Sequence, residues 1–190
     1  MRADLDSVDL KILRELQRDG RMTNVELAEQ AGLKTANGIW VNEFAQTEDP
    51  NIVAAGDCTN HPNTLLNTRL RLESVPNAME QAKSAAASIC EQPIKYAAHP
   101  WFWSDQFDIK LQIAGFNMGY DEVILRGDPS VGRSFVAWYL KQNKLIAADC
   151  INRPKEFMIT KQLLAKQISP AKHLLSDESV DPKCFLDNSA

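Results

Sequence analysis

The stretch that decides the fold is residues 47–57, TEDPNIVAAGD, in which a turn is followed by a short apolar run and a Gly-Asp pair. Residues 52–55 are small and apolar, which is typical of a strand buried on both faces of a parallel sheet. Gly56 lets another backbone or a ligand come close to the end of that strand. Asp57 is therefore predicted to lie just past a strand's carboxyl end, where open α/β sheets bind ligands.

Residues 71–89, RLESVPNAMEQAKSAAASI, indicate an alanine-rich helix with its start marked. Ser74 is suited to the N-cap and Pro76 to the first turn. The free N–H groups and the positive dipole end at such a start favour an anion. The two stretches together predict an α/β layer with a ligand-binding edge.

Composition bounds the class of protein. The chain has 190 residues, of which 44% are hydrophobic and 24% charged, and this suits one or two globular domains with a core. A net charge of -4 and a pI near 5.4 argue against a dominating attraction to nucleic acid or to an anionic membrane. Without a membrane-length apolar run or a signal-peptide core, the sequence predicts a cytoplasmic protein.

The cysteines are widely spaced and form no C-x-x-C motif, so the sequence suggests neither a metal site nor a dithiol redox centre. We expect them to be reduced and mostly buried small apolar residues. They are Cys58, Cys90, Cys150 and Cys184.

The first 33 residues indicate two helices, one between Asp6 and Gly20 and one over residues 24–31. The segment LDSVDLKILRELQRDGRMTNVELAEQAGL resembles the start of the helix-turn-helix in Lrp/AsnC transcription regulators. A recognition helix should follow, yet KTANGIWVNEFAQ has a glycine turn and then alternating apolar residues, Ile39 and Val41, as in a strand. Specific DNA binding is therefore not expected.

Between these regions, residues 60–67 are predicted to form a polar loop, with His61 at the surface or in loop packing. Arg69 and Arg71 are either a basic rim facing an acidic iron–sulfur partner or ordinary solvated arginines.

From Pro100 onward the sequence predicts a small α+β domain. Expected strands cover residues 109–114, 122–126, 135–140 and 145–149, with Gln142-Asn143 turning the last two into a hairpin. A helix over residues 155–166 packs on them through Phe157, Leu163 and Leu164. Trp101 and Trp103 flank Phe102, so a strand would point both indoles to one face.

Three motifs in order, TEDPNIVAAGDC, RLESVPNAMEQAKSAAASI and PWFWSDQFDIKLQIAG, resemble the FAD-dependent ferredoxin, rubredoxin and putidaredoxin reductases. The resemblance implies that Asp57, after Gly56, holds a ribityl hydroxyl of FAD. It implies that Val75, after the cap Ser74, offers its N–H to the flavin pyrimidine edge. Trp103 would lie beside the flavin and face the redox partner. No catalytic side chain and no metal ligand is assigned.

The resemblance implies three segments: a truncated helix-turn-helix-like start over residues 1–33, the last part of an FAD-binding α/β layer over 34–95, and a reductase C-terminal α+β domain over 97–190. Residues 24–33 fit both families, so we expect a chimera joined within that stretch. The glycine-rich G-x-G-x-x-G of the first FAD motif is not found.

The function expected from this resemblance is part of an NAD(P)H-dependent ferredoxin or rubredoxin reductase, inactive alone, with FAD bound weakly or not at all. Two alternatives stay open, an Lrp/AsnC-like DNA-binding regulator and a non-catalytic interaction remnant, and so does a dimer. The parent partner would be a ferredoxin or a rubredoxin, and no membrane partner is expected.

Overall fold

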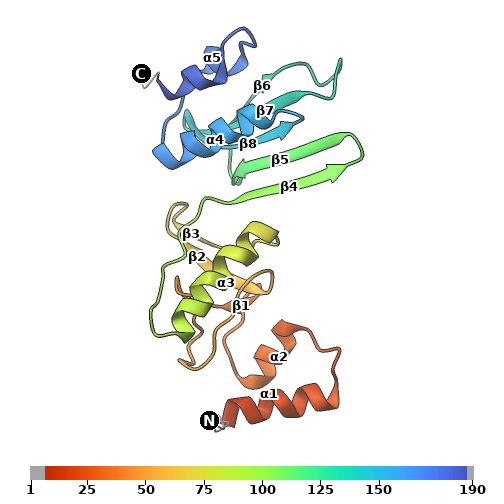
Figure 1. Ribbon diagram of the computed structural model, residues 1–190, viewed down its shortest axis with the longest axis vertical. Helices are drawn as coiled ribbons and strands as arrows, with labels where there is room; N and C mark the ends of the chain where they lie inside the picture. Colours follow the sequence, from red (N-terminus) through yellow and green to blue (C-terminus); the bar gives the residue numbers. More distant parts are fainter. Residues whose placement is uncertain (1–6, 188–190) are drawn as a thin grey trace. The chain divides into compact units, whose positions relative to one another are not determined.

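The computed structural model describes residues 7–187, which form two compact units that divide between Ala98 and His99 (Figure 1). The fold combines a short N-terminal helical segment, an open three-stranded sheet with one long helix, and an α+β unit built on a five-stranded open sheet. This mixture of α/β and α+β structure confirms the predicted fold class.

The first unit begins with α1 (Ser7–Arg18) and α2 (Asn24–Ala31), as the sequence predicts. A capping box fixes the start of α2, because Thr23 accepts from the Glu26 N–H while the Glu26 carboxylate accepts from the Thr23 N–H at 2.8 Å. Gly32 ends the helix at φ +87°, a left-handed conformation that suits glycine. The described part of α1 has no buried residue, and Leu10, Leu13 and Leu16 are exposed on it.

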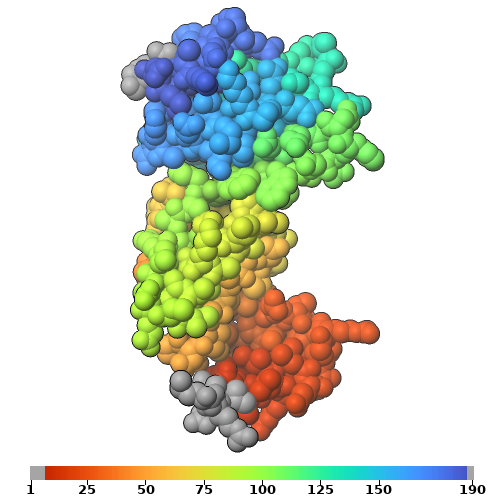
Figure 2. Space-filling view, viewed as in Figure 1, coloured from red at the N-terminus to blue at the C-terminus, as the bar shows by residue number. Residues whose placement is uncertain are grey.

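Figure 2 shows the outer surface of α1 in red, with no other described element in front of it in this view. An amphipathic helix normally buries its apolar stripe against the core. In α1 a large part of that stripe remains at the surface.

The sheet of this unit has the order β1-β2-β3, where β1 is Ile39–Trp40, β2 is Thr59–Asn63 and β3 is Thr68–Leu70. β1 and β2 are parallel, and β2 and β3 are antiparallel. The predicted polar loop over residues 60–67 is therefore wrong, since its first half is the buried strand β2. The polar side chains of β2 are satisfied by neighbours, as when Asn63 donates to the Ala98 carbonyl at 3.2 Å.

The predicted strand over residues 52–55 is also wrong. Its only ladder contact is a single antiparallel bridge between Gln46 and Val53, and its residues are half-buried. A strand requires a neighbour along each bonded edge. This segment has one on one edge only, so Asp57 follows an extended turn and precedes β2.

A long helix, α3 (Val75–Ile89), covers the sheet side of this unit, and its N-cap is Ser74 as predicted. The apolar core here is small: Ala28, Ile39 and Val41 are buried. Arg69 is part of this interior, because it stacks over the Trp40 ring at 3.5 Å and donates to the Val41 carbonyl at 2.7 Å. The rim interpretation of Arg69 is therefore wrong.

The second unit is a five-stranded antiparallel sheet in the order β4-β5-β8-β7-β6. Its strands are β4 (Trp101–Gln106), β5 (Ile109–Gly115), β6 (Glu122–Arg126), β7 (Phe135–Lys141) and β8 (Lys144–Ile151). Gln142 and Asn143, at φ +51° and +62°, form the predicted hairpin turn between β7 and β8.

Three helical elements follow the sheet of this unit: α4 (Pro154–Lys166), α5 (Lys172–Ser176) and the 3-10 helix η1 (Pro182–Leu186). They close one core with β5, β7 and β8, in which Trp138 packs edge-to-face on Phe185 at 6.0 Å and Leu163 is fully buried. Phe157, Leu163 and Leu164 of α4 are buried, as predicted.

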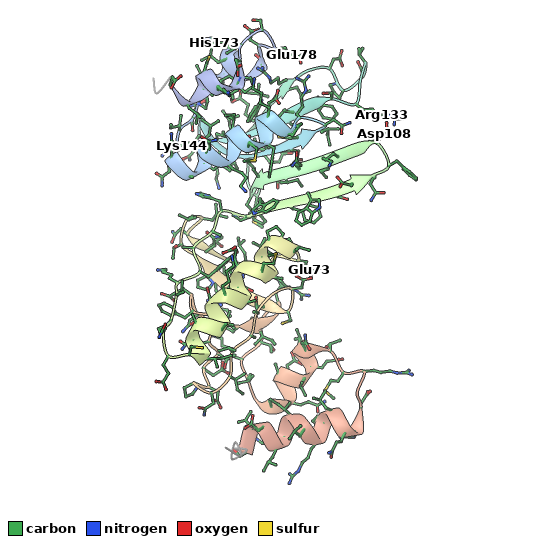
Figure 3. The ribbon with its side chains drawn as sticks, in the orientation of Figure 1. Glu73, Asp108, Arg133, Lys144, His173 and Glu178 are labelled. Atoms are coloured by element: carbon green, nitrogen blue, oxygen red, sulfur yellow. The ribbon has the colours of Figure 1, made fainter. Side chains whose placement is uncertain are left out.

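Polar ties hold the ends of this unit. Arg126, 2% exposed, lies 3.4 Å from the Glu156 carboxylate and donates to the carbonyls of Asp177 and Val180 at 2.6 Å each. Figure 3 labels a second tie at the surface, where Arg133 lies 3.1 Å from Asp108, the residue between β4 and β5.

All four cysteines are free, but Cys90 and Cys184 are exposed and Cys58 is half-buried. The expectation of mostly buried cysteines is therefore wrong, and only Cys150 fits it. Among the described residues, no helix is long and apolar enough to cross a membrane.

Candidate functional site

Gly56 is held against α3 by a buried amide. Its N–H donates to the Gln81 Oε1 at 2.7 Å, and the same oxygen accepts from the Thr59 hydroxyl at 2.8 Å. Gly56 has φ +84°, and a Cβ built on it would lie 3.4 Å from the Ala78 Cβ. Glycine therefore permits both the turn and the close approach of the helix.

Asp57 is exposed at the corner that follows this glycine. Its carbonyl accepts from Arg71 Nε at 2.9 Å, and Arg71 Nη2 lies 2.9 Å from the carboxylate of Glu73, which Figure 3 labels. The Asp57 carboxylate has no hydrogen bond or ion pair within residues 7–187. Arg71 thus fixes the backbone of Asp57 and leaves its carboxylate available.

The start of α3 is built by its cap and by Asn77. Ser74 Oγ accepts from the Asn77 N–H at 3.4 Å, while the Asn77 amide donates to the Leu72 carbonyl at 2.8 Å and accepts from the Tyr96 hydroxyl at 2.9 Å. Val75 is 56% exposed, and its N–H has no acceptor in the described part of the chain. A free donor at a helix start favours an electron-rich acceptor.

The structure therefore brings four of the predicted site residues to one region of the first unit. Gly56 and Asp57 are tied through Gln81 and Arg71 to the helix that carries Ser74 and Val75. The site offers a free carboxylate, which accepts from a hydroxyl, and a free N–H, which donates to a heteroatom. This donor set fits the ribityl and pyrimidine groups of a flavin.

Trp103 lies on β4 in the second unit. Its ring stacks on Trp101 at 5.4 Å with a 26° interplanar angle, which confirms that both indoles share one face. Trp101 continues inward to Phe157, whereas Trp103 remains 38% exposed. The two indoles line a pocket of about 230 Å³ together with Asp105, Lys110 and Gln112.

His61 is the residue that sequence reasoning misplaced most. Its side chain is 1% exposed, packs edge-to-face on Tyr96 at 5.0 Å, and has no hydrogen-bond partner for either ring nitrogen within the described residues. Burial, with the positive charge of Arg69 nearby, lowers the pKa of His61 to about 4. A neutral imidazole in the interior is the consequence.

Gln81 and Asn77 are the functional positions that sequence reasoning missed. Both are buried polar residues on a helix otherwise rich in alanine. Amides on the buried face of such a helix could have marked them, because a buried amide requires a partner.

Comparison with known proteins places these features in a family. Residues 101–186 match the family described as Reductase C-terminal, and residues 5–37 match the AsnC-type helix-turn-helix domain. The chain is 44% identical over 164 residues to putidaredoxin reductase of Pseudomonas putida and 45% identical over 166 residues to a probable ferredoxin reductase of Castellaniella defragrans. The chain is homologous to the C-terminal portion of ferredoxin reductases.

Each of these two ferredoxin reductases matches 86% of this chain, and the chain spans only 39% of the length of each. The fold agrees as well. A chain in the crystal structure of the covalent putidaredoxin reductase–putidaredoxin complex matches with a TM-score of 0.80 at 43% identity, over 86% of this chain and 39% of that one.

The AsnC-type match includes α1 and α2 and stops at residue 37, two residues before β1 begins. In the described residues the next helix after α2 is α3, which starts at Val75. The prediction that the helix-turn-helix lacks its recognition helix is confirmed. The N-terminal segment is a regulator-like start joined to reductase-like structure, as predicted.

Proposed function

We propose that the chain supplies the isoalloxazine and ribityl side of an FAD site in a ferredoxin reductase. In the complete site, electrons pass from NAD(P)H to a ferredoxin or rubredoxin. The observation that carries the proposal is the free carboxylate of Asp57 and the free N–H of Val75, tied to one another through Arg71 and Gln81. FAD, when bound, supplies the exchange between two-electron and one-electron transfer.

Each residue has a defined part in this proposal. The Asp57 carboxylate accepts a hydrogen bond from a ribityl hydroxyl, and the Val75 N–H donates to the pyrimidine edge. Gly56 and Ser74 hold the backbone that presents them, the first by its left-handed φ and the second by capping α3. Trp103 presents an exposed indole that is suited to stacking on an aromatic ring.

The chain alone is expected to bind FAD weakly. A charge-assisted hydrogen bond contributes about 1.5 to 3 kcal/mol, a helix start about 0.3 to 1 and an aromatic stack about 0.5 to 1.5. The entropy cost of association is about 4 kcal/mol or more, so little net affinity remains. The dissociation constant should be weaker than about 0.1 mM.

A titration of the purified chain with FAD, followed by flavin fluorescence, tests the binding. A second assay adds NADH and a ferredoxin and follows ferredoxin reduction. We expect no turnover from the chain alone, and activity once the N-terminal portion of a related reductase is supplied.

Asp57→Ala should abolish the regained activity. Glu43→Ala is the matched control, because Glu43 is a carboxylate of the same unit whose nearest cation, Lys95 Nζ, is 3.7 Å away. Robust turnover by the chain alone, or equal activity of the two variants after complementation, would refute the proposal.

The AsnC-type match favours a second candidate, a DNA-binding regulator, and we propose that the chain does not act as one. Base edges in the major groove are read by a recognition helix. In this chain β1 follows α2 directly, and the net charge is -4. A gel-shift series over salt concentration should show no sequence-selective binding. Nanomolar selective binding at physiological salt would establish the regulator instead.

A further inference from the structure

The extended segment 52–55 is bonded along one edge only. The Thr47 N–H donates to the Ile52 carbonyl at 3.1 Å, and the Ala54 N–H donates to the Ala45 carbonyl at 3.0 Å. On the other edge, the N–H groups of Val53 and Ala55 and the carbonyl of Val53 have no partner in residues 7–187. Donors and an acceptor that alternate along an open edge form a template for another strand.

This open edge faces an apolar pocket. Val53 and Ala55 both line a pocket of about 290 Å³ within the first unit, and Ile12 of α1 and Leu27 of α2 contribute to its walls. No lining residue is charged, and Asn24 supplies the one carboxamide. The pocket therefore suits uncharged apolar side chains, held beside backbone groups that need hydrogen bonds.

We propose that this edge and pocket bind an extended apolar strand from another polypeptide, by strand addition beside residues 52–55. The partner's carbonyls would accept from the N–H groups of Val53 and Ala55, and its N–H would donate to the Val53 carbonyl. Its alternate side chains would enter the apolar pocket between this segment and α1 and α2. Main-chain bonds supply affinity and the pocket supplies selectivity in this mode of recognition.

The polar pattern of the site decides between occupants. A small apolar molecule would fill the pocket but leave the three backbone groups without partners, at a cost for each buried polar group. A strand satisfies the backbone and the pocket together, because its own partial charges complement those of the open edge. The interaction does not depend on flavin, so it is separate from the function proposed above.

The probe is an acetylated and amidated heptapeptide, Lys-Val-Thr-Val-Thr-Val-Lys, added to the full chain. Amide hydrogen exchange should slow about tenfold or more at Val53 and Ala55 when the peptide is saturating. The same peptide with N-methyl groups on its five central residues should give no protection, because it lacks the donors and cannot pair.

The thiol of Cys58 gives a second readout, since it lines the pocket and is half-buried. Peptide should slow its alkylation by a maleimide about tenfold and leave the exposed Cys90 unchanged. Ala55→Pro removes one free N–H and should weaken peptide binding about tenfold, whereas Ala97→Pro, an exposed position outside the pocket, should not. Comparison of the two peptides on the unmodified chain keeps the test independent of how the proline variant folds.

Three outcomes would overturn the proposal. The methylated peptide protects Val53 and Ala55 as well as the unmodified one does, or an anilinonaphthalene sulfonate dye protects Cys58 while neither peptide does. Otherwise, sedimentation shows that the chain pairs with a second copy and that the peptide leaves this self-association unchanged.

Discussion

The two units are held together by different forces. The second unit buries 13 residues in one apolar cluster, led by Trp138, Phe185 and Leu163. The first unit has only three residues in its buried apolar cluster, and much of its interior is polar, including His61 and Gln81. Apolar burial is non-directional and adds up with area, whereas a polar interior is stable only while each group keeps its partner. The second unit should therefore tolerate loss of its neighbours better than the first.

Removal of Trp138 should give the largest effect. The side chain is fully buried against Phe185, so Trp138→Ala should lower the free energy of unfolding of its unit by about 3 to 5 kcal/mol. Val41→Ala, in the small core of the first unit, removes far less area and should cost about 2 kcal/mol. Urea denaturation followed by circular dichroism measures both. Equal losses in the two variants would argue against a difference between the cores.

The buried ion pair of the second unit comes next. Arg126→Met leaves the Glu156 carboxylate inside the unit with Arg153 as its remaining cation, and it removes two donors from the carbonyls of Asp177 and Val180. Breaking such a pair costs about 3 kcal/mol. The double variant Arg126→Met, Glu156→Leu should recover part of the stability, as thermal unfolding would show. A double variant that is less stable than Arg126→Met would contradict this.

The sequence predicted α1 to α4 and the β7–β8 hairpin because their signals are local. Periodic apolar residues, the Ser74 cap and the Gln142-Asn143 turn act within a few residues of one another. The strand over residues 52–55 failed because a strand depends on partners that are distant in the chain. β2 was missed because its side chains are polar and include Pro62, and their partners, such as Arg69 at Asn60 Oδ1, come from elsewhere.

The candidate site followed the same division. Ser74 and Gly56 could be assigned from their positions in the sequence. The amide of Gln81, which joins Gly56 to α3, depends on tertiary packing and could not be predicted.

The polar interior of the first unit predicts a pH dependence that the second unit lacks. Burial lowers the pKa of His61 to about 4, below its unfolded value of 6.5, so the unfolded chain binds the extra proton between these two pH values. Stability is full above about pH 6.5 and should fall by about 2 kcal/mol as pH drops toward 4. His61→Phe should remove this pH dependence from the first unit, as urea denaturation at pH 7 and pH 4.5 would show. An unchanged slope in the variant would remove His61 as the cause.

The smallest expected effect is at the start of α3. Ser74→Ala removes the acceptor for the Asn77 N–H and should cost about 1 kcal/mol of stability in the first unit alone. Ser74→Asp should retain the cap and the stability. Denaturation followed by probes in each unit measures the change, and a loss shared by both units would contradict a local role for the cap.

Hydrogen exchange of the full chain, resolved by residue at pH 7, tests the difference between the units most directly. We predict that amides of β7 and β8 exchange only through global opening of their unit. Amides of β1, β2 and α3 should exchange through a lower-energy opening, at rates about 100-fold faster or more. Uniform protection across both units, with β1 and β2 as slow as β7 and β8, would contradict the account.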